Sequence, residues 1–174
     1  MKKALLVIMV SLVCGVFLAS CGAPKFVNKS PAFSFEYPSG YKAEPLQGKT
    51  EVARIANQNQ YKIPVYTATV SDKAAGAKLE DMAQGWVDTV QQNTPKADRF
   101  KVLEQNLVKL SDGTDAVAFK IKWRWIDRVT YLQSSAVSAF QGDKVINITG
   151  TTVFGGDTSM DKMLEQCMTL KFSE

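Results

Sequence analysis

The fold is decided by one stretch of the chain, Thr114-Asp-Ala-Val-Ala-Phe-Lys-Ile-Lys-Trp-Arg-Trp-Ile126, in which apolar and basic residues alternate. Successive side chains of a β-strand point to opposite faces of the sheet, so this alternation predicts a long strand. One face is expected to pack beneath a helix and holds Val117, Phe119, Ile121, Trp123 and Trp125. The other face carries a row of cations, Lys120, Lys122 and Arg124.

The sequence around this strand predicts an antiparallel meander. Residues 99–110, 129–140 and 144–153 also have the pattern of strands, and consecutive runs are separated by turn sequences, Ser111-Asp-Gly113 and Gln141-Gly-Asp143. Such short turns join antiparallel neighbours. Upstream, three shorter strands are predicted, over residues 33–37, 49–56 and 60–70. Pro64 in the last of them indicates an edge strand or a bulge.

Two amphipathic helices accompany these strands. Between residues 78 and 92, apolar side chains recur every three or four positions, which is the spacing of one helix face. They are Leu79, Met82, Ala83, Trp86, Val87 and Val90. A second helix is predicted over residues 158–170, where Thr158 and Asp161 have the spacing of a capping box. One helix amid the strands and another at the end predict an α+β fold, not a series of βαβ units.

The N-terminal segment resembles the leader of a bacterial lipoprotein. Lys2 and Lys3 precede an apolar run over residues 4–19, which is the arrangement of a secretory signal. The alternative, a transmembrane helix, needs about 20 apolar residues, and this run is shorter. Leu18-Ala-Ser-Cys21 resembles the lipobox, in which the leader is cut before a cysteine that receives lipid. We therefore expect a signal peptide over residues 1–20, a lipidated Cys21 with a tether over residues 21–31, and a single domain over residues 32–174.

Composition excludes several classes of activity. The formal charge is +4, and without Lys2 and Lys3 the 21 basic residues become 19 against 17 acidic ones, or +2. A near balance gives no basic footprint for nucleic acid. The chain has no histidine, which excludes Ser-His-Asp and Cys-His nucleophiles and histidine metal ligands. Of three cysteines, Cys14 leaves with the leader and Cys21 carries lipid, so Cys167 has no partner for an internal disulfide.

A second resemblance concerns the domain. Phe33-Ser-Phe-Glu-Tyr-Pro-Ser-Gly-Tyr41 resembles the opening of PsbP-like domains, as do the mid-chain helix, the turn Asp112-Gly-Thr114 and the ending Leu170-Lys-Phe172. That group includes extrinsic photosystem subunits, a Ran-binding import factor and DcrB-like envelope lipoproteins. The resemblance implies an antiparallel β-sheet sandwiched between helices, an α/β/α sandwich over residues 32–173. The metal-binding histidines of photosystem members have no counterpart here, so no metal or cofactor is expected.

The basic row is the candidate partner-binding site. Lys120, Lys122, Arg124 and nearby Arg128 could receive an anionic headgroup, an acidic partner or a phosphate. The alternative, which we favour, is a solvated face whose long side chains lie over apolar neighbours. Trp125 could line a protein-binding patch if the apolar stripe extends beyond its covering helix. Cys167 falls on the apolar face of the last helix, where a thiol behaves as a small hydrophobe.

These observations favour a non-catalytic envelope lipoprotein that binds a protein or lipid-linked partner near a membrane. Gly22 in place of aspartate after the lipidated cysteine favours the outer membrane, facing the periplasm, in bacteria that have one. The alternative is a lipoprotein that binds a small ligand for a transporter, which needs a cavity of roughly 300 Å³ or more. An enzyme with Ser-Lys or carboxylate chemistry is the third possibility. The sequence predicts no oligomeric state.

Overall fold

The computed structural model describes residues 22–59, 61–127 and 129–173 and has an α+β fold with two antiparallel sheets. The larger sheet has seven strands in the order β3-β4-β5-β9-β8-β7-β6. Their bounds are β3 Lys42–Ala43, β4 Glu51–Ala56, β5 Val65–Asp72, β6 Asp98–Lys109, β7 Asp115–Arg124, β8 Tyr131–Gln141 and β9 Lys144–Val153. The predicted meander is confirmed, because β6, β7, β8 and β9 pair antiparallel in succession.

Two details of the strand prediction were wrong. The strand expected over residues 60–70 begins only at Val65, after a cis peptide bond between Ile63 and Pro64. Pro64 therefore precedes β5 and does not mark an edge, since β5 lies between β4 and β9. A proline cannot donate to a ladder, but here it stands outside the ladder and its carbonyl accepts a hydrogen bond from the Asn57 amide.

The expected tether is shorter than predicted, because part of it folds. Residues Lys25–Lys29 form strand β1, which pairs antiparallel with β2, Ala32–Glu36. Together with β10, Lys171–Phe172, they make the small sheet β1-β2-β10. The ring of Phe26 packs against Phe33 and Phe35, and this burial outweighs the turn-forming prolines on either side. The predicted leader, Leu18 and Cys21 lie outside the described residues.

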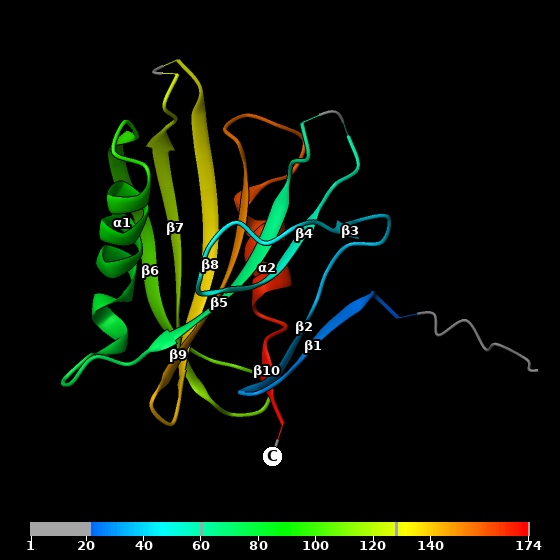
Figure 1. Ribbon diagram of the computed structural model, residues 1–174, viewed down its shortest axis with the longest axis vertical. Coiled ribbons are helices and arrows are strands. Elements are labelled where there is room, and N and C mark those ends of the chain that lie inside the picture. The colour runs from blue at the N-terminus through cyan, green and yellow to red at the C-terminus, as the bar shows by residue number, and fades with distance from the viewer. Residues whose placement is uncertain (1–21, 60, 128, 174) are drawn as a thin grey trace, which may run out of the picture.

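The larger sheet has a different cover on each face, as Figure 1 shows. One face packs against helix α1, Met82–Asn93, which follows a short 3-10 turn, η1, Leu79–Asp81. The other face packs against helix α2, Met160–Cys167, and against the small sheet. The predicted sandwich of a sheet between helices is therefore confirmed. We call these two sides the α1 face and the α2 face.

Strand β7 contributes to both cores, as its alternation predicts. Val117, Phe119, Ile121 and Trp123 are buried on the α1 face. Ala116 and Ala118 are buried on the α2 face, where the basic row continues the same side of the strand. Helix α2 begins two residues later and ends three residues earlier than the predicted span of 158–170. Its N-cap is Ser159 and not Thr158, because the Ser159 hydroxyl accepts a hydrogen bond from the Lys162 amide at 3.2 Å. None of the described helices is long and apolar enough to cross a bilayer.

Candidate functional site

The structure brings the three described residues of the basic row together on the α2 face, where acidic side chains meet them. Lys120 is 15% exposed, and its Nζ lies 2.6 Å from Asp161 Oδ1 and 2.6 Å from Glu104 Oε2. Hydrogen bonds from Lys120 to Asp161 and to Glu104 raise the pKa of the ammonium group. Lys120 therefore links β7 to α2 and to β6. The two carboxylates compensate its positive charge, which disfavours binding of an external anion there.

The other members of the row also have internal neighbours. Arg124 Nε donates to Asp98 Oδ1 at 2.6 Å, and this contact raises the pKa of the guanidinium. Lys122 Nζ lies over two rings, 3.4 Å from the centroid of Phe154 and 4.8 Å from that of Tyr131. Arg128 lies outside the described residues. The basic row as a partner-binding site stays a prediction, although the internal carboxylates favour its reading as a structural face.

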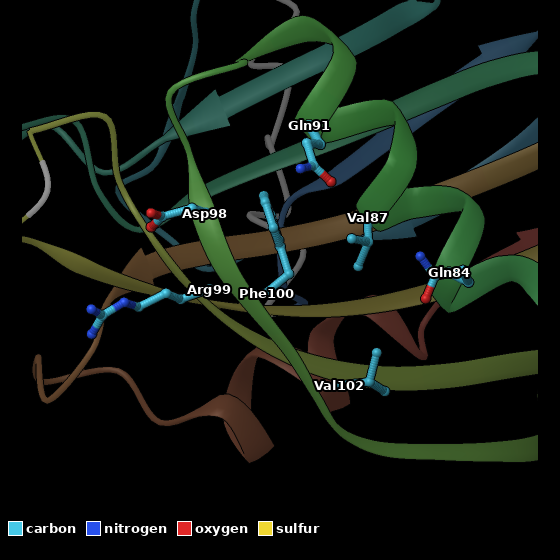
Figure 2. Close-up of a pocket in the computed structure, with 7 residues that line it drawn as sticks. All are labelled: Gln84, Val87, Gln91, Asp98, Arg99, Phe100 and Val102. Carbon is cyan, nitrogen blue, oxygen red and sulfur yellow. The ribbon is translucent and has the colours of Figure 1, made fainter.

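A groove lies between α1 and β6 on the α1 face. It has a volume of about 450 Å³ and opens widely to solvent. Figure 2 shows its lining: Val87, Phe100 and Val102 point into it from the helix and the strand, and Gln84 and Gln91 stand on the helix side. Asp98 and Arg99 lie at the end of the groove where β6 begins. We call this the α1–β6 groove; its floor is apolar and its rim is polar.

The floor of the groove rests on a cluster of aromatic rings. Phe100 stacks on Trp123 with ring centroids 5.5 Å apart and an interplanar angle of 10°. Trp86 and Trp125 meet Trp123 edge-on at 6.2 and 5.5 Å. The indole N–H of Trp123 donates to Ser134 Oγ at 3.2 Å, so its polar atom is satisfied inside the core. These rings give the groove a fixed base.

Strand β6 departs from regular geometry where it borders the groove. Its register against β7 shifts between Asp98 and Lys101 and again between Val102 and Glu104. Arg99 has a positive φ of 54°, and its Nη1 donates to the Tyr131 hydroxyl at 3.1 Å. Such bulges re-aim side chains along an edge strand. Here they bring both Phe100 and Val102 to the groove.

A second hollow, of about 510 Å³, lies beside α2 and is also open to solvent. Its lining is Pro38, Tyr41, Tyr66, Thr158, Lys162, Glu165, Gln166 and Thr169. Tyr66 is only 1% exposed, and burial raises the pKa of its hydroxyl. Its ring fits because position 150 is glycine: a Cβ there would lie 2.9 Å from Tyr66 Cε1. We call this the Tyr66 hollow.

The other functional candidate from the sequence, Cys167, is part of the hydrophobic core. Cys167 is fully buried, and burial raises the pKa of its thiol to about 12. Its Sγ lies 3.5 Å from the Ser135 carbonyl oxygen, to which it donates. A thiol in this setting is not activated as a nucleophile. Among the described residues, no group of three or more Cys, Asp or Glu side chains could hold a metal ion.

Comparison with known proteins identifies the fold. No family model and no curated protein sequence matches this chain. Among solved structures, cyanobacterial PsbP (CyanoP) from Synechocystis sp. PCC 6803 is similar with a TM-score of 0.69 and 12% identity, over 90% of this chain and 99% of that one. A protein from Bacteroides thetaiotaomicron VPI-5482 is similar with a TM-score of 0.54 and 18% identity, over 87% of this chain and 49% of that one. The chain has a PsbP-like fold.

Sequence reasoning missed the α1–β6 groove, although one signal pointed to it. Residues 98–109 lack strict alternation, because Val102 and Leu103 are consecutive and Leu107 and Val108 are consecutive. A strand with apolar side chains on both faces is either fully buried or an exposed edge. The structure makes it an edge, since β6 is the last strand in the sheet order.

Proposed function

We propose that the protein is a non-catalytic accessory domain, held on the outer side of a bacterial membrane by lipid on Cys21, that binds a protein partner through the α1–β6 groove. The observation that carries this proposal is the position of the groove. A depression with an apolar floor and a polar rim lies directly beside β6, whose outer edge has no neighbouring strand among the described residues. Such an edge can pair with an extended segment of another protein, while alternate side chains of that segment enter the groove.

The groove favours a peptide segment over a small molecule. Its floor is apolar, its rim carries the amides of Gln84 and Gln91, and its mouth is wide. Small-molecule sites enclose most of their ligand, which an open groove does not. The expected occupant is an extended segment with apolar side chains two residues apart, because every second side chain of a paired strand faces the groove.

The side chains that commonly act as nucleophile or general base are missing or engaged in the fold, which supports a non-catalytic role. The chain has no histidine, and its remaining thiol, on Cys167, is buried with a raised pKa. Asp112 is occupied as well: its carboxylate accepts hydrogen bonds from the Phe172 and Thr114 amides, and its pKa is lowered. These groups hold the fold together and do not converge on a substrate position.

The proposed anchor would hold the domain against the bilayer. Only three residues separate Cys21 from Lys25 at the start of β1, and the four Cα–Cα steps span about 14 Å of extended chain. Lys25, Val27 and Lys29 are exposed and alternate on the outer side of β1. Two lysines at an anionic surface contribute about 1 kcal/mol each. Gly22, in place of aspartate after the cysteine, supports sorting to the outer membrane.

Site-specific photocrosslinking in cells tests the binding surface. A photoreactive amino acid at Gln91, on the rim of the groove, is compared with one at Glu165, beside the Tyr66 hollow on the α2 face. We expect Gln91 to capture one defined envelope protein, and we expect Val102→Asp, which places a charge in the groove floor, to abolish that product. Equal capture from both positions, or capture that Val102→Asp leaves unchanged, would contradict the proposal.

A second candidate function, binding of a small ligand, is favoured by the Tyr66 hollow. Its volume exceeds the roughly 300 Å³ that a ligand site needs, and a buried tyrosine lines it, but it is as open to solvent as the α1–β6 groove. Native mass spectrometry of the protein purified from its own membrane would detect such a ligand. Lys162→Trp, which fills the hollow from α2, should then remove the bound mass.

A further inference from the structure

The outer edge of β6 is exposed over most of its length. Residues 101–107 are all exposed, including Leu103 at 44% and Leu107 at 59%. β6 ends the strand order of the large sheet, so within the part of the chain that the structure describes no strand lies beside its outer backbone groups. A long edge with apolar side chains pairs readily with another strand unless something covers it. In Figure 1 this edge borders α1 but is not covered by another strand.

The sequence of this edge is almost a palindrome. Lys101-Val-Leu-Glu-Gln-Asn-Leu-Val-Lys109 reads the same in both directions except that Glu104 corresponds to Asn106. In an antiparallel pair of identical strands around a two-fold axis, each residue lies opposite its mirror position in the other copy. We propose that two copies of this protein pair antiparallel through β6, with the two-fold axis at Gln105, to form one continuous sheet.

In this register the cross-strand pairs between the two copies are favourable. Leu103 lies opposite Leu107 of the second copy, twice per dimer, and apolar cross-strand pairs stabilise sheets. Glu104 lies opposite Asn106 of the second copy, so a carboxylate meets an amide donor. Within one chain this pairing already occurs, because Asn106 Nδ2 donates to Glu104 Oε1 at 2.8 Å.

The bulge in β6 keeps like charges apart. Lys101 lies opposite Lys122 on β7 and shares the α2 face, whereas Lys109 lies opposite Asp115, on the same side of β7 as Val117. Residues directly opposite each other in an antiparallel pair share a face, so Lys101 and Lys109 of the second copy do not form a cross-strand pair. The matched register is therefore confined to residues 103–107. Lys109 is also neutralised within its own chain, since its Nζ lies 2.6 Å from Asp115 Oδ1.

The two-fold axis also suits attachment to one membrane. An axis perpendicular to the large sheet carries the small sheet of both copies to the same side. Figure 1 shows that the small sheet and the N-terminal end of the described chain lie on the side of the large sheet away from α1. Both β1 strands, with Lys25 and Lys29 outward, then face the same plane. This point rests on the proposed lipid anchor; the pairing of β6 does not.

The area of one strand pair is at the small end of specific interfaces, so the dimer is weak in dilute solution. Confinement of anchored copies to one surface raises their effective concentration. The α1–β6 groove is lined by β6 residues between Asp98 and Val102, which precede the paired residues 103–107.

Disulfide trapping in the full-length protein tests the register. Gln105→Cys, oxidised in native membranes, should give a covalent dimer, because a residue on the axis faces itself at about 4.5–5.5 Å between Cα atoms. Asn106→Cys, the matched control on the same strand, should give roughly tenfold less, since its own copy lies beyond the reach of a disulfide. Co-expressed Leu103→Cys and Leu107→Cys, with different tags, should form a mixed dimer. The buried Cys167 does not compete.

A second variant tests the contact itself. Leu107→Lys in the Gln105→Cys background should reduce the trapped dimer several-fold while the monomer remains folded by circular dichroism. Equal trapping at Gln105 and Asn106, no dimer, or trapping of Gln105→Cys to a different protein would overturn the proposal. Detergent-purified protein at high concentration separates this result from the anchor: a dimer there, without one in membranes, contradicts the anchored arrangement and leaves the β6 pairing standing.

Discussion

The two faces of the large sheet differ in how completely they are covered. The α2 face lies under a helix and a second sheet, and its core includes Phe33, Phe35 and Met163, all fully buried. The α1 face has one helix, whose contact with β6 leaves an open groove and partly buried rings. Much of the fold's stability is thus expected on the α2 face, and the α1 face has apolar surface left for a partner.

The largest expected effect compares one phenylalanine from each face. Phe35→Ala removes a fully buried ring from the α2 core and should lower the free energy of unfolding by about 3–5 kcal/mol. Phe100→Ala removes a partly exposed ring from the α1 face and should cost about 1–2 kcal/mol. Denaturant unfolding measures both. If Phe100→Ala were the more damaging change, the comparison between the faces would be wrong.

Substitution of one glycine on each face, Gly150 and Gly85, also tests the difference in packing between the two faces. A Cβ at Gly150 would lie 2.9 Å from Tyr66 Cε1 and 3.1 Å from Met163 Cβ, so Gly150→Ala should destabilise by about 1–3 kcal/mol through overpacking. Gly85 in α1 has open space at its Cβ. Gly85→Ala should stabilise by about 0.5–1 kcal/mol, because alanine has the higher helix propensity. Thermal melts of the two variants should therefore shift in opposite directions.

The ion pairs of Lys120 should contribute less. Asp161 and Glu104 raise its folded-state pKa, so their stabilisation is fully present below the unfolded lysine pKa of about 10.4. It is lost as the pH rises through the raised folded-state value. At neutral pH Lys120→Met should cost about 1 kcal/mol or less, since both carboxylates are solvated. The alkaline fall in stability should be smaller in Lys120→Met than in the unchanged protein, as measured by unfolding at pH 8 and pH 11.

Cys167 should show the smallest effect of all. Burial raises the pKa of its thiol to about 12, so the native protein at pH 8 should not react with a thiol reagent over hours. In denaturant the same residue should react within minutes, because exposure restores an ordinary thiol. Mass spectrometry after labelling distinguishes the two states. Rapid labelling of the native protein would mean that the α2 face opens locally.

The strands that pack on both faces could be predicted from sequence, and the irregular ones could not. The alternation from Val117 to Trp123 fixes β7, and turn sequences fix its neighbours, because both signals are local. Strand β1 was missed because its only clear apolar residue on the inner side is Phe26, and the partner rings are seven or more residues away. The groove depends on two bulges in β6, and the compensation of Lys120 depends on Asp161, 41 residues later in the chain.

Amide hydrogen exchange tests most directly whether the α1 face is the one that binds. The anchored protein in its native membrane is compared with soluble Cys21→Ser protein at low concentration. We expect membrane anchoring to slow exchange in residues 98–109 of β6 and in the facing side of α1, with little change over α2. Unchanged exchange in β6, together with new protection confined to residues 158–169, would contradict this account.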